Sequence, residues 1–472
     1  MGNNSVIYWE PPPQGPEGLR LPEPHKTKMV EPARLISRAR REKALRKAFY
    51  NVFNLKSEDI YIDLLTDSGT NAMSQFQWAE IMRGDESYAG SSSFDTLRDT
   101  IEEIFGFKYV LPAHQGRSAE LVLMTHLVNK GDIVPGNMHF DTTSAHIEFQ
   151  GGIPMNFPSP KIFDLPDRSL FKGDVEIQQL SEFLKKNHKK VPLVIITATC
   201  NTGGGQPVSM RNVKETSGIC RKYNIPLFID AARVIENAYF IREYEPGFKL
   251  RSIKSIVKEM MSYASGMIMS AKKDGLVNIG GFIATNDAKL FEALKQYVIL
   301  FDGFITYGGL AGRDLLAIAQ GLREACDLHY LRYRIAQVAY LALSLEKEGI
   351  KVMMPPGGHA VYVCGASFCP HLKPSEFPAQ ALTLALYLEG GVRGCEVGTI
   401  LAGRDPITHK NRFNGLDLMR LAIPRRVYSF NHLDYVIDCL LRLKKKSRTI
   451  RGVRFVEEAK VLRHFSSKFA LI

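Results

Sequence analysis

Two apolar, β-branched runs decide the predicted fold, VPLVIITAT (191–199) and IPLFID (225–230), and a segment of helical pattern lies between them around 209–223. Such a strand–helix–strand unit predicts parallel strands, and a series of these units forms a mostly parallel sheet covered by helices. Strands and helices alternate in this way from about residue 60. We therefore expect an α/β protein whose ligand lies at the carboxyl ends of the strands.

The composition is that of a globular protein, with 45% hydrophobic and 23% charged residues among 472. These fractions exclude a mainly disordered or collagen-like chain. No run of about 18 apolar residues occurs and the first residues do not resemble a signal peptide, so we expect no membrane association. The seven cysteines form neither a CxxC pair nor a zinc-type cluster, so a reduced, cytoplasmic location is expected.

Much of the net charge of +12 comes from two basic segments, residues 34–47 and 442–454. Basic segments that bind nucleic acid usually carry interleaved aromatic residues, and neither segment has them. We interpret both as solvated helix surfaces and expect no nucleic-acid partner.

Three parts of the chain differ in pattern. Residues 1–27 are rich in proline and glycine and predict an arm with little power to fold alone. A helix predicted at about 330–348, from apolar residues spaced by three and four, leads into a new strand region. We expect a large domain at 66–326 and a smaller α+β domain formed by 28–65 together with 327–472.

A twin-lysine turn, SAKKD (270–274), is the sharpest chemical signal. Adjacent lysines repel, which favours a neutral amine on one of them, and a neutral amine can form a Schiff base with an aldehyde cofactor. Upstream, Asp230 ends an apolar strand, with Arg233 close behind, and a carboxylate there can keep a pyridine nitrogen protonated. Either feature alone is more typical of a solvated loop or a strand-end cap, whereas together they predict a site for pyridoxal phosphate.

The remaining parts of such a site also follow strands. The segment PAHQGRSAE (112–120) leads into an apolar helix, whose first backbone N–H groups can hold a phosphate. Phe140 can stack on a planar ring. Residues 115–117, Phe140, Asn201, Asp230 and Lys273 thus occur in the order phosphate site, ring stacker, ring-oxygen partner, ring-nitrogen partner and lysine, which is typical of fold-type I pyridoxal-phosphate enzymes.

Long strings across the chain, from about residue 28 to the C-terminus, carry a resemblance: IDLLTDSGTNAMS (62–74), MRGDESYAGS (82–91), HQGRSAE (114–120), MSAKKD (269–274), YGGLAGRD (307–314), EFPAQAL (376–382), IPRRVY (423–428) and VLRHF (461–465). They resemble the β-eliminating lyases, the family of tryptophanase and tyrosine phenol-lyase. The resemblance implies a fold-type I enzyme with a seven-stranded, mostly parallel sheet in its large domain.

The resemblance also implies a role for each matching residue. Lys273 would form the Schiff base and remove the substrate α-proton, and Arg420 would bind the substrate carboxylate in a bidentate pair. Asn201 would contact the ring oxygen and the substrate carboxylate, and Thr66 and Ser68 would lie in the substrate loop. The implied cofactor-binding residues are Gln115, Gly116, Arg117, Phe140, Asn201, Asp230, Arg233, Ser270, Lys272 and Lys273.

Further implications concern subunits and a cation. The family forms homotetramers with shared active sites. A neighbouring subunit would contribute Tyr88, as the general acid or orienting group at the leaving group, and Tyr307. Gly69, Glu86 and Asn278 match a monovalent-cation site used by potassium, whose oxygen ligands suit a hard ion. The chain departs from the pattern at Ala232 and Ala422, where many relatives carry a hydroxyl residue, and the former change predicts weaker cofactor binding.

Three positions distinguish the two family activities, and all favour L-tryptophan, which would yield indole, pyruvate and ammonia. Phenol-lyases carry an arginine that binds the phenol oxygen where this chain has Val397. Tryptophanases share the aspartate and histidine found here as Asp141 and His464, a pair suited to the acid–base chemistry of an indole ring.

Alternatives remain open at this point. The strings VNIGGF, GLAGRD and IPRRVY are closer to the phenol-lyase branch, which favours L-tyrosine. A general cysteine or serine β-lyase needs less ring chemistry, and a catalytically silent paralogue with an assembly or binding role belongs to a different class. The intact Lys273, Asp230, Arg420 and Tyr88 argue against the last of these.

Overall fold

The computed structural model describes residues 21–405, 408–413 and 415–472. Most of the predicted arm at 1–27 lies outside these ranges, and residues 21–27 form neither helix nor strand. Among the helices of the described ranges, none combines the length and apolar composition needed to span a membrane.

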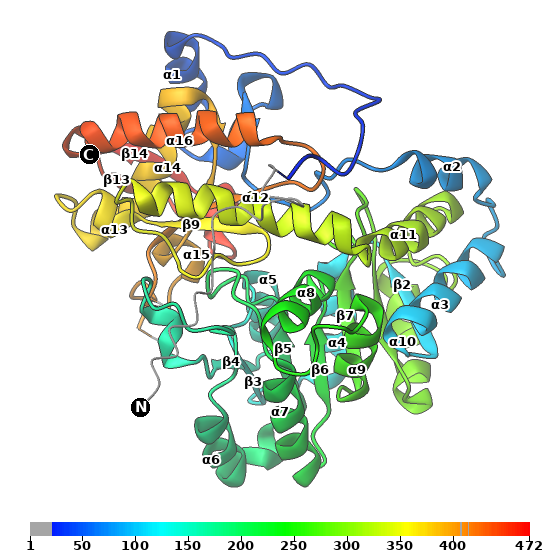
Figure 1. The fold of residues 1–472 in the computed structure, drawn as a ribbon. Helices are drawn as coiled ribbons and strands as arrows, with labels where there is room; N and C mark the ends of the chain where they lie inside the picture. The colour runs from blue at the N-terminus through cyan, green and yellow to red at the C-terminus, as the bar shows by residue number, and fades with distance from the viewer. Residues whose placement is uncertain (1–20, 406–407, 414) are drawn as a thin grey trace, which may run out of the picture.

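A seven-stranded sheet lies in the lower part of the molecule as Figure 1 shows it. Only β8 runs antiparallel to its neighbours, so the predicted mostly parallel sheet is confirmed. The strands, in spatial order, are β2 (Tyr109–Ala113), β8 (Gly281–Thr285), β7 (Gly266–Ser270), β6 (Leu227–Asp230), β5 (Val194–Thr197), β3 (Ile133–Gly136) and β4 (Ile153–Asn156).

Both faces of this sheet are buried, which explains why its strands read as continuous apolar runs. Along β6, Leu227 and Ile229 pack into the core on one face, whereas Phe228 packs into the core on the other. The first face is covered by α3 (Ser92–Phe105), α7 (Met210–Lys222), α8 (Val234–Tyr244), α9 (Ile253–Ser262) and α11 (Gly312–Ala325). The opposite face is covered by α4 (Gly116–Leu127), α5 (Asp141–Phe149) and α10 (Ala288–Phe301).

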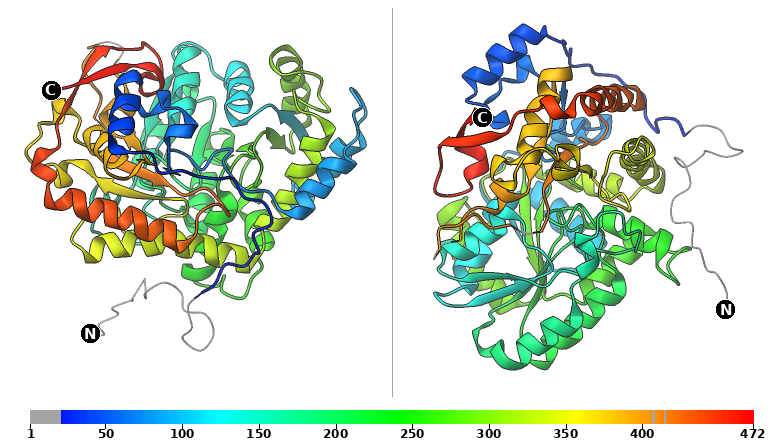
Figure 2. Two further views of the ribbon diagram at one scale, coloured as in Figure 1. Left: turned by 90° about the horizontal axis from the view of Figure 1, so that it is seen from above. Right: turned by 90° about the vertical axis from the view of Figure 1, so that its left-hand side faces the viewer.

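A second set of elements packs around a different apolar core (Figure 2). The predicted helix at 330–348 is confirmed as α12 (Leu328–Lys347). It packs with the antiparallel strands β11 (Cys395–Val397), β12 (Leu418–Ala422) and β9 (Ala360–Cys364), and with α14 (Pro378–Gly390) and α16 (Phe430–Lys445).

The N-terminal segment joins this second set. The strand β1 (Ile62–Asp63) pairs in parallel with β10 (Val392–Arg393), and α1 (Arg38–Lys47) packs beside α14. The C-terminal hairpin of β13 (Val453–Glu457) and β14 (Lys468–Leu471) covers the same region. The domain limits, between residues 65 and 66 and between residues 326 and 327, remain a prediction. The separate apolar cores support them.

Candidate active site

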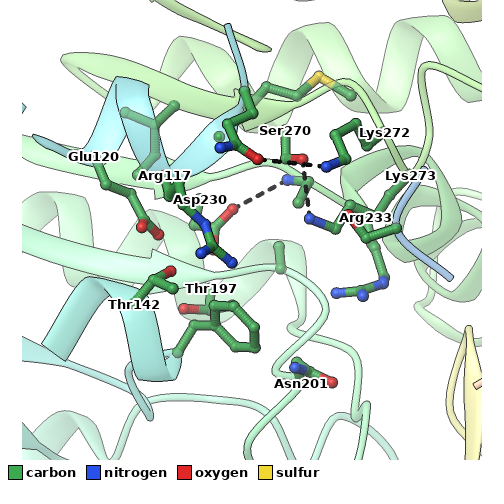
Figure 3. Close-up of a pocket in the computed structure, with 18 of the residues that line it drawn as sticks. Arg117, Glu120, Thr142, Thr197, Asn201, Asp230, Arg233, Ser270, Lys272 and Lys273 are labelled. Carbon is green, nitrogen blue, oxygen red and sulfur yellow. Dashed lines mark hydrogen bonds between the residues drawn. The ribbon is translucent and has the colours of Figure 1, made fainter. Parts of the chain in front are cut away.

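One cavity at the carboxyl ends of the central strands gathers the whole predicted cofactor set (Figure 3). Its predicted lining residues are Ser68, Gln115, Gly116, Arg117, Phe140, Asn201, Asp230, Arg233, Ser270, Lys272 and Lys273. Strand ends supply most of them, because parallel strands bring the residues that follow them to one edge of the sheet.

Lys273 lies in the turn after β7, where its Nζ donates to Ser270 Oγ at 2.9 Å. Burial first, and the charge of Arg233 next, lower the pKa of this amine to about 8. The sequence argument attributed the neutral amine to repulsion by Lys272, but that charge contributes less than burial does. The amine is therefore prepared for covalent chemistry mainly by its dry surroundings.

Asp230 ends β6 on the other side of the cavity (Figure 3). Burial raises the pKa of its carboxyl. The Ala232 N–H, which donates to Oδ1 at 3.2 Å, and the charge of Lys273 both lower this pKa, but burial has the larger effect. A buried carboxylate of this kind is stabilised by a cationic partner, such as a protonated pyridine nitrogen. The Ala232 contact uses the backbone, so it does not require the hydroxyl that many relatives carry there.

The start of α4 provides an anion site. Its N-cap residue, Gln115, makes no side-chain capping hydrogen bond, so the first N–H groups of the helix face the cavity without that partner. A Cβ added at Gly116 would lie 2.5 Å from Ser270 Cβ, so only glycine allows this close approach. Together with the neighbouring amine of Lys272, these features fit the phosphate of pyridoxal phosphate.

Arg420 adjoins the cavity through Asn201. Its Nη1 donates to Asn201 Oδ1 at 3.3 Å and its Nη2 to the carbonyl of Leu65 at 3.0 Å. Its buried Nε has no partner within the described part of the chain and can serve a carboxylate. In the nearby loop, Thr66 Oγ1 accepts from the Ser68 N–H at 3.1 Å.

The structure pairs Asp141 with His464, although more than half of the chain separates them in sequence. Asp141 Oδ2 lies 3.0 Å from His464 Nε2, and both side chains are buried. Burial would raise the pKa of Asp141, but the hydrogen bond and charge of His464, together with the Thr142 N–H and the charge of Arg420, lower it below its usual value. Val397, by contrast, packs with Ala422 in an apolar cluster.

Tyr88 does not line the cavity of its own chain. It is 69% exposed, and its ring lies 5.2 Å from that of Tyr307 and 5.7 Å from that of Phe304. The hydrogen bond between the Tyr88 and Tyr307 hydroxyls raises the pKa of Tyr88.

The three predicted cation ligands are not brought together within one chain. The carbonyl of Gly69 accepts from Asn278 Nδ2 at 3.0 Å, whereas the side chain of Glu86 pairs with Arg313. Within one chain, these three residues therefore do not form a single site.

Sequence reasoning missed a buried charge network behind the cavity. Arg425 contacts Asp67, Glu236 and Asp274 at 2.7–3.1 Å, and Arg233 and Arg334 complete the network through Asp67 and Glu236. The only signal for these residues is that Asp67, Asp274 and Arg425 lie inside the matched strings. Asp67 adjoins Ser68 and Asp274 adjoins Lys273, so the network supports both sides of the cavity.

Glu120 was also missed. This residue of α4 lines the cavity and accepts from Thr143 Oγ1 at 2.6 Å. Burial first, and the charge of Asp230 next, raise the pKa of its carboxyl to about 7.

Comparison with solved structures defines the class of protein. Serine palmitoyltransferase (SPT) from Sphingomonas wittichii superposes with a TM-score of 0.59 at 13% identity, over 87% of this chain and 97% of its own. An SPT solved with PLP gives 0.59 at 16% identity, over the same shares of the two chains. The fold, with its seven-stranded central sheet, is that of the fold-type I pyridoxal-phosphate enzymes.

Sequence relatives identify the family, since residues 63–439 match the beta-eliminating lyases. A probable beta-eliminating lyase of Trichomonas vaginalis is 51% identical over 95% of this chain and 98% of its own. A tyrosine phenol-lyase of Pasteurella multocida is 48% identical (95% and 98%), and a tryptophanase of Salinibacter ruber is 47% identical (94% and 94%). The chain belongs to the beta-eliminating lyase family and is a pyridoxal-phosphate-dependent lyase.

Proposed function

We propose that this lyase acts on L-tryptophan and releases indole, pyruvate and ammonia. The observation that carries the proposal is the buried Asp141–His464 pair, 3.0 Å apart, in a chain that has Val397 where a phenol-binding arginine is expected. Overall identity does not separate the candidates, because the phenol-lyase and tryptophanase relatives are about equally similar.

Bound pyridoxal phosphate supplies the electron sink that stabilises a carbanion at the substrate α-carbon. The chain's own residues do the rest. Lys273 Nζ takes the α-proton, Asp230 keeps the ring nitrogen protonated, and Arg420 binds the substrate carboxylate with its guanidinium fork.

Indole leaves only after its ring carbon has been protonated, so the site needs an acid near the leaving group. Asp141 accepts a hydrogen bond from His464, and this contact orients the imidazole. We assign this pair, with Tyr88 from a neighbouring subunit, to the protonation and binding of the indole ring.

Product assays test the proposal. Purified enzyme supplied with pyridoxal phosphate and potassium is expected to favour tryptophan over tyrosine. Without an arginine at 397, a buried phenol hydroxyl lacks a hydrogen bond to a charged group, which would contribute about 1.5–3 kcal/mol. This loss corresponds to a preference for tryptophan over tyrosine of about 10- to 150-fold in kcat/KM. Phenol from tyrosine exceeding indole from tryptophan would reverse the assignment in favour of tyrosine phenol-lyase activity. Rapid turnover confined to S-methylcysteine would indicate a general β-lyase.

Replacing His464 by phenylalanine is expected to lower kcat for tryptophan by about 10²-fold, since a positioned acid–base group contributes at least that much. Turnover of S-methylcysteine, whose thiolate leaves without ring protonation, should change little. His371→Phe is the matched control, because its ring only bonds the carbonyl of Ile450, at 2.8 Å. Equal loss for both substrates would contradict the assigned role.

We further propose a homotetramer with shared active sites, in the cytoplasm. Exposed apolar side chains on α2 (Gln75–Arg83) and α10 support an assembly, and they are Phe76, Trp78, Met82, Ile299 and Leu300. Glu86 of one subunit would complete a potassium site at Gly69 and Asn278 of the next. The seven free cysteines support a reducing compartment.

Mixing two defective variants tests the shared site. Tyr88→Phe and Lys273→Ala are each expected to have little activity alone. After subunit exchange, some hybrid sites combine an intact Lys273 with an intact Tyr88 from the neighbour, so elimination of tryptophan should reappear. If the mixture is no more active than its separate components, Tyr88 and Lys273 of one site come from the same chain.

A further inference from the structure

The side-chain oxygen of Asn201 is enclosed by donors. Tyr362 Oη lies 2.7 Å from Asn201 Oδ1, His359 Nε2 lies 2.8 Å from it, and Arg420 Nη1 lies 3.3 Å from it. Asn201, His359 and Tyr362 are each at most 2% exposed, so water does not compete for these contacts.

The surroundings of His359 show which of its nitrogens carries the proton. Nε2 faces two oxygens, Asn201 Oδ1 and Tyr362 Oη, the latter at 3.1 Å, whereas Nδ1 has no partner among the described residues. A neutral imidazole donates from one nitrogen, so the hydrogen lies on Nε2. Burial first, and the charge of Arg233 next, hold the pKa of His359 well below its usual range and keep the ring neutral.

These contacts fix the orientation of the Asn201 amide. A carbonyl oxygen accepts from all three groups, whereas an NH₂ group in the same place would face the Nε2–H of His359 and the guanidinium of Arg420, neither of which can accept. Turning the amide over would therefore lose the bonds from His359 and Arg420, and the Tyr362 hydroxyl, which now donates at 2.7 Å, would have to accept instead. With its oxygen held away, Asn201 presents its NH₂ group to the cavity, which it lines.

We propose that Tyr362 is a positioning residue: together with His359 it holds the amide of Asn201 so that an N–H, and not the carbonyl, faces the ring oxygen of the bound cofactor. This inference rests on the proposed function, which makes Asn201 the ring-oxygen partner. Tyr362 belongs to β9 and Asn201 follows β5, so the contact also joins the second core to the cofactor cavity.

The hydrogen bonds from Tyr362 and His359 to Asn201 become more important when substrate binds. Arg420 Nη1 makes the longest of the three contacts with Asn201 Oδ1, and this guanidinium is the proposed ligand of the substrate carboxylate. When Arg420 turns to that carboxylate, Tyr362 and His359 still keep the amide in place. The charged groups around Tyr362 and His359, namely Arg233, Arg334, Arg420 and Asp67, are unchanged by Tyr362→Phe.

The test titrates the visible absorbance of the cofactor-loaded holoenzyme against pH. The Asn201 N–H stabilises the anionic ring oxygen, which lowers the pKa of the protonated group beside that oxygen. Tyr362→Phe releases the amide, so the titration midpoint of the absorbance should rise by about one unit, equivalent to tenfold in the equilibrium. The value of kcat for tryptophan should fall about tenfold while KM changes little, because Arg420 is intact. Asn201→Asp, which removes the donor, should shift the midpoint further in the same direction.

Tyr387→Phe is the matched control. This tyrosine is equally buried and its hydroxyl donates to the carbonyl of Asp59 at 3.0 Å, in the apolar core around α14. A merely structural role would lower the thermal midpoint of both Tyr→Phe variants without moving the absorbance midpoint. That result, with Asn201→Asp still shifted, overturns the inference and leaves the proposed function intact. A wild-type protein that binds no cofactor, or an unshifted Asn201→Asp, overturns the inference together with the role of Asn201.

Discussion

Lys273→Ala is expected to remove the visible absorbance of cofactor-loaded protein and to lower β-elimination by about 10³-fold or more. The variant lacks both the amine that holds the cofactor and the group that takes the α-proton, and proton transfer by a positioned group alone contributes about 10²- to 10⁴-fold. No other amine lining the cavity replaces it, because Lys272 is directed toward Gln115 Oε1, 3.4 Å away. The measurement is an absorbance spectrum and an indole assay on the same preparation.

The apoprotein provides a control against simple unfolding. In the folded chain the pKa of Lys273 falls from 10.5 to about 8. The unfolded chain therefore binds more protons between these values, and wild-type stability rises with pH through this range. Lys273→Ala removes an unfavourable contribution on the order of 3 kcal/mol at neutral pH, so it should be at least as stable as wild type there. Inactivity accompanied by a lower thermal midpoint at pH 7 would contradict this account.

Arg425→Met is expected to destabilise the protein by about 3–5 kcal/mol, because it leaves buried carboxylates without their shared partner. Arg425 is fully buried and contacts Asp67, Glu236 and Asp274. Methionine fills much of the volume but carries no charge. Scanning calorimetry of the apoprotein measures the loss as a lower thermal midpoint.

Arg38→Met is the matched control, since this arginine is 55% exposed and pairs with Glu42 on the surface of α1 at 3.2 Å. Exposed pairs contribute about 0–1 kcal/mol, so its thermal midpoint should scarcely change. Adding Asp274→Asn to Arg425→Met should recover part of the lost stability, because it removes one of the buried carboxylates that Arg425 contacts. Equal midpoints for the two arginine variants would show that the network does not stabilise the fold.

The sequence alone determined the mostly parallel sheet and which strand-end residues line one cavity. Residues such as Leu227, Phe228 and Ile229 alternate between two buried faces, so the apolar runs predicted a parallel sheet with helices on both faces. Parallel strands end at one edge, so Asp230 after one strand and Ser270 to Lys273 after another had to meet there. These relations depend on local pattern and on a topology with few alternatives.

Only the tertiary structure decided the contacts between distant segments. Asp141 and His464 meet because the C-terminal residues fold back beside α5, and Arg425 reaches Asp67 and Asp274 only when the second core packs against the sheet. The donors that orient Asn201 come from β9 and β12 for the same reason. Hydrogen bonds and ion pairs depend on distances of about 3 Å, which local periodicity does not specify and which packing alone sets.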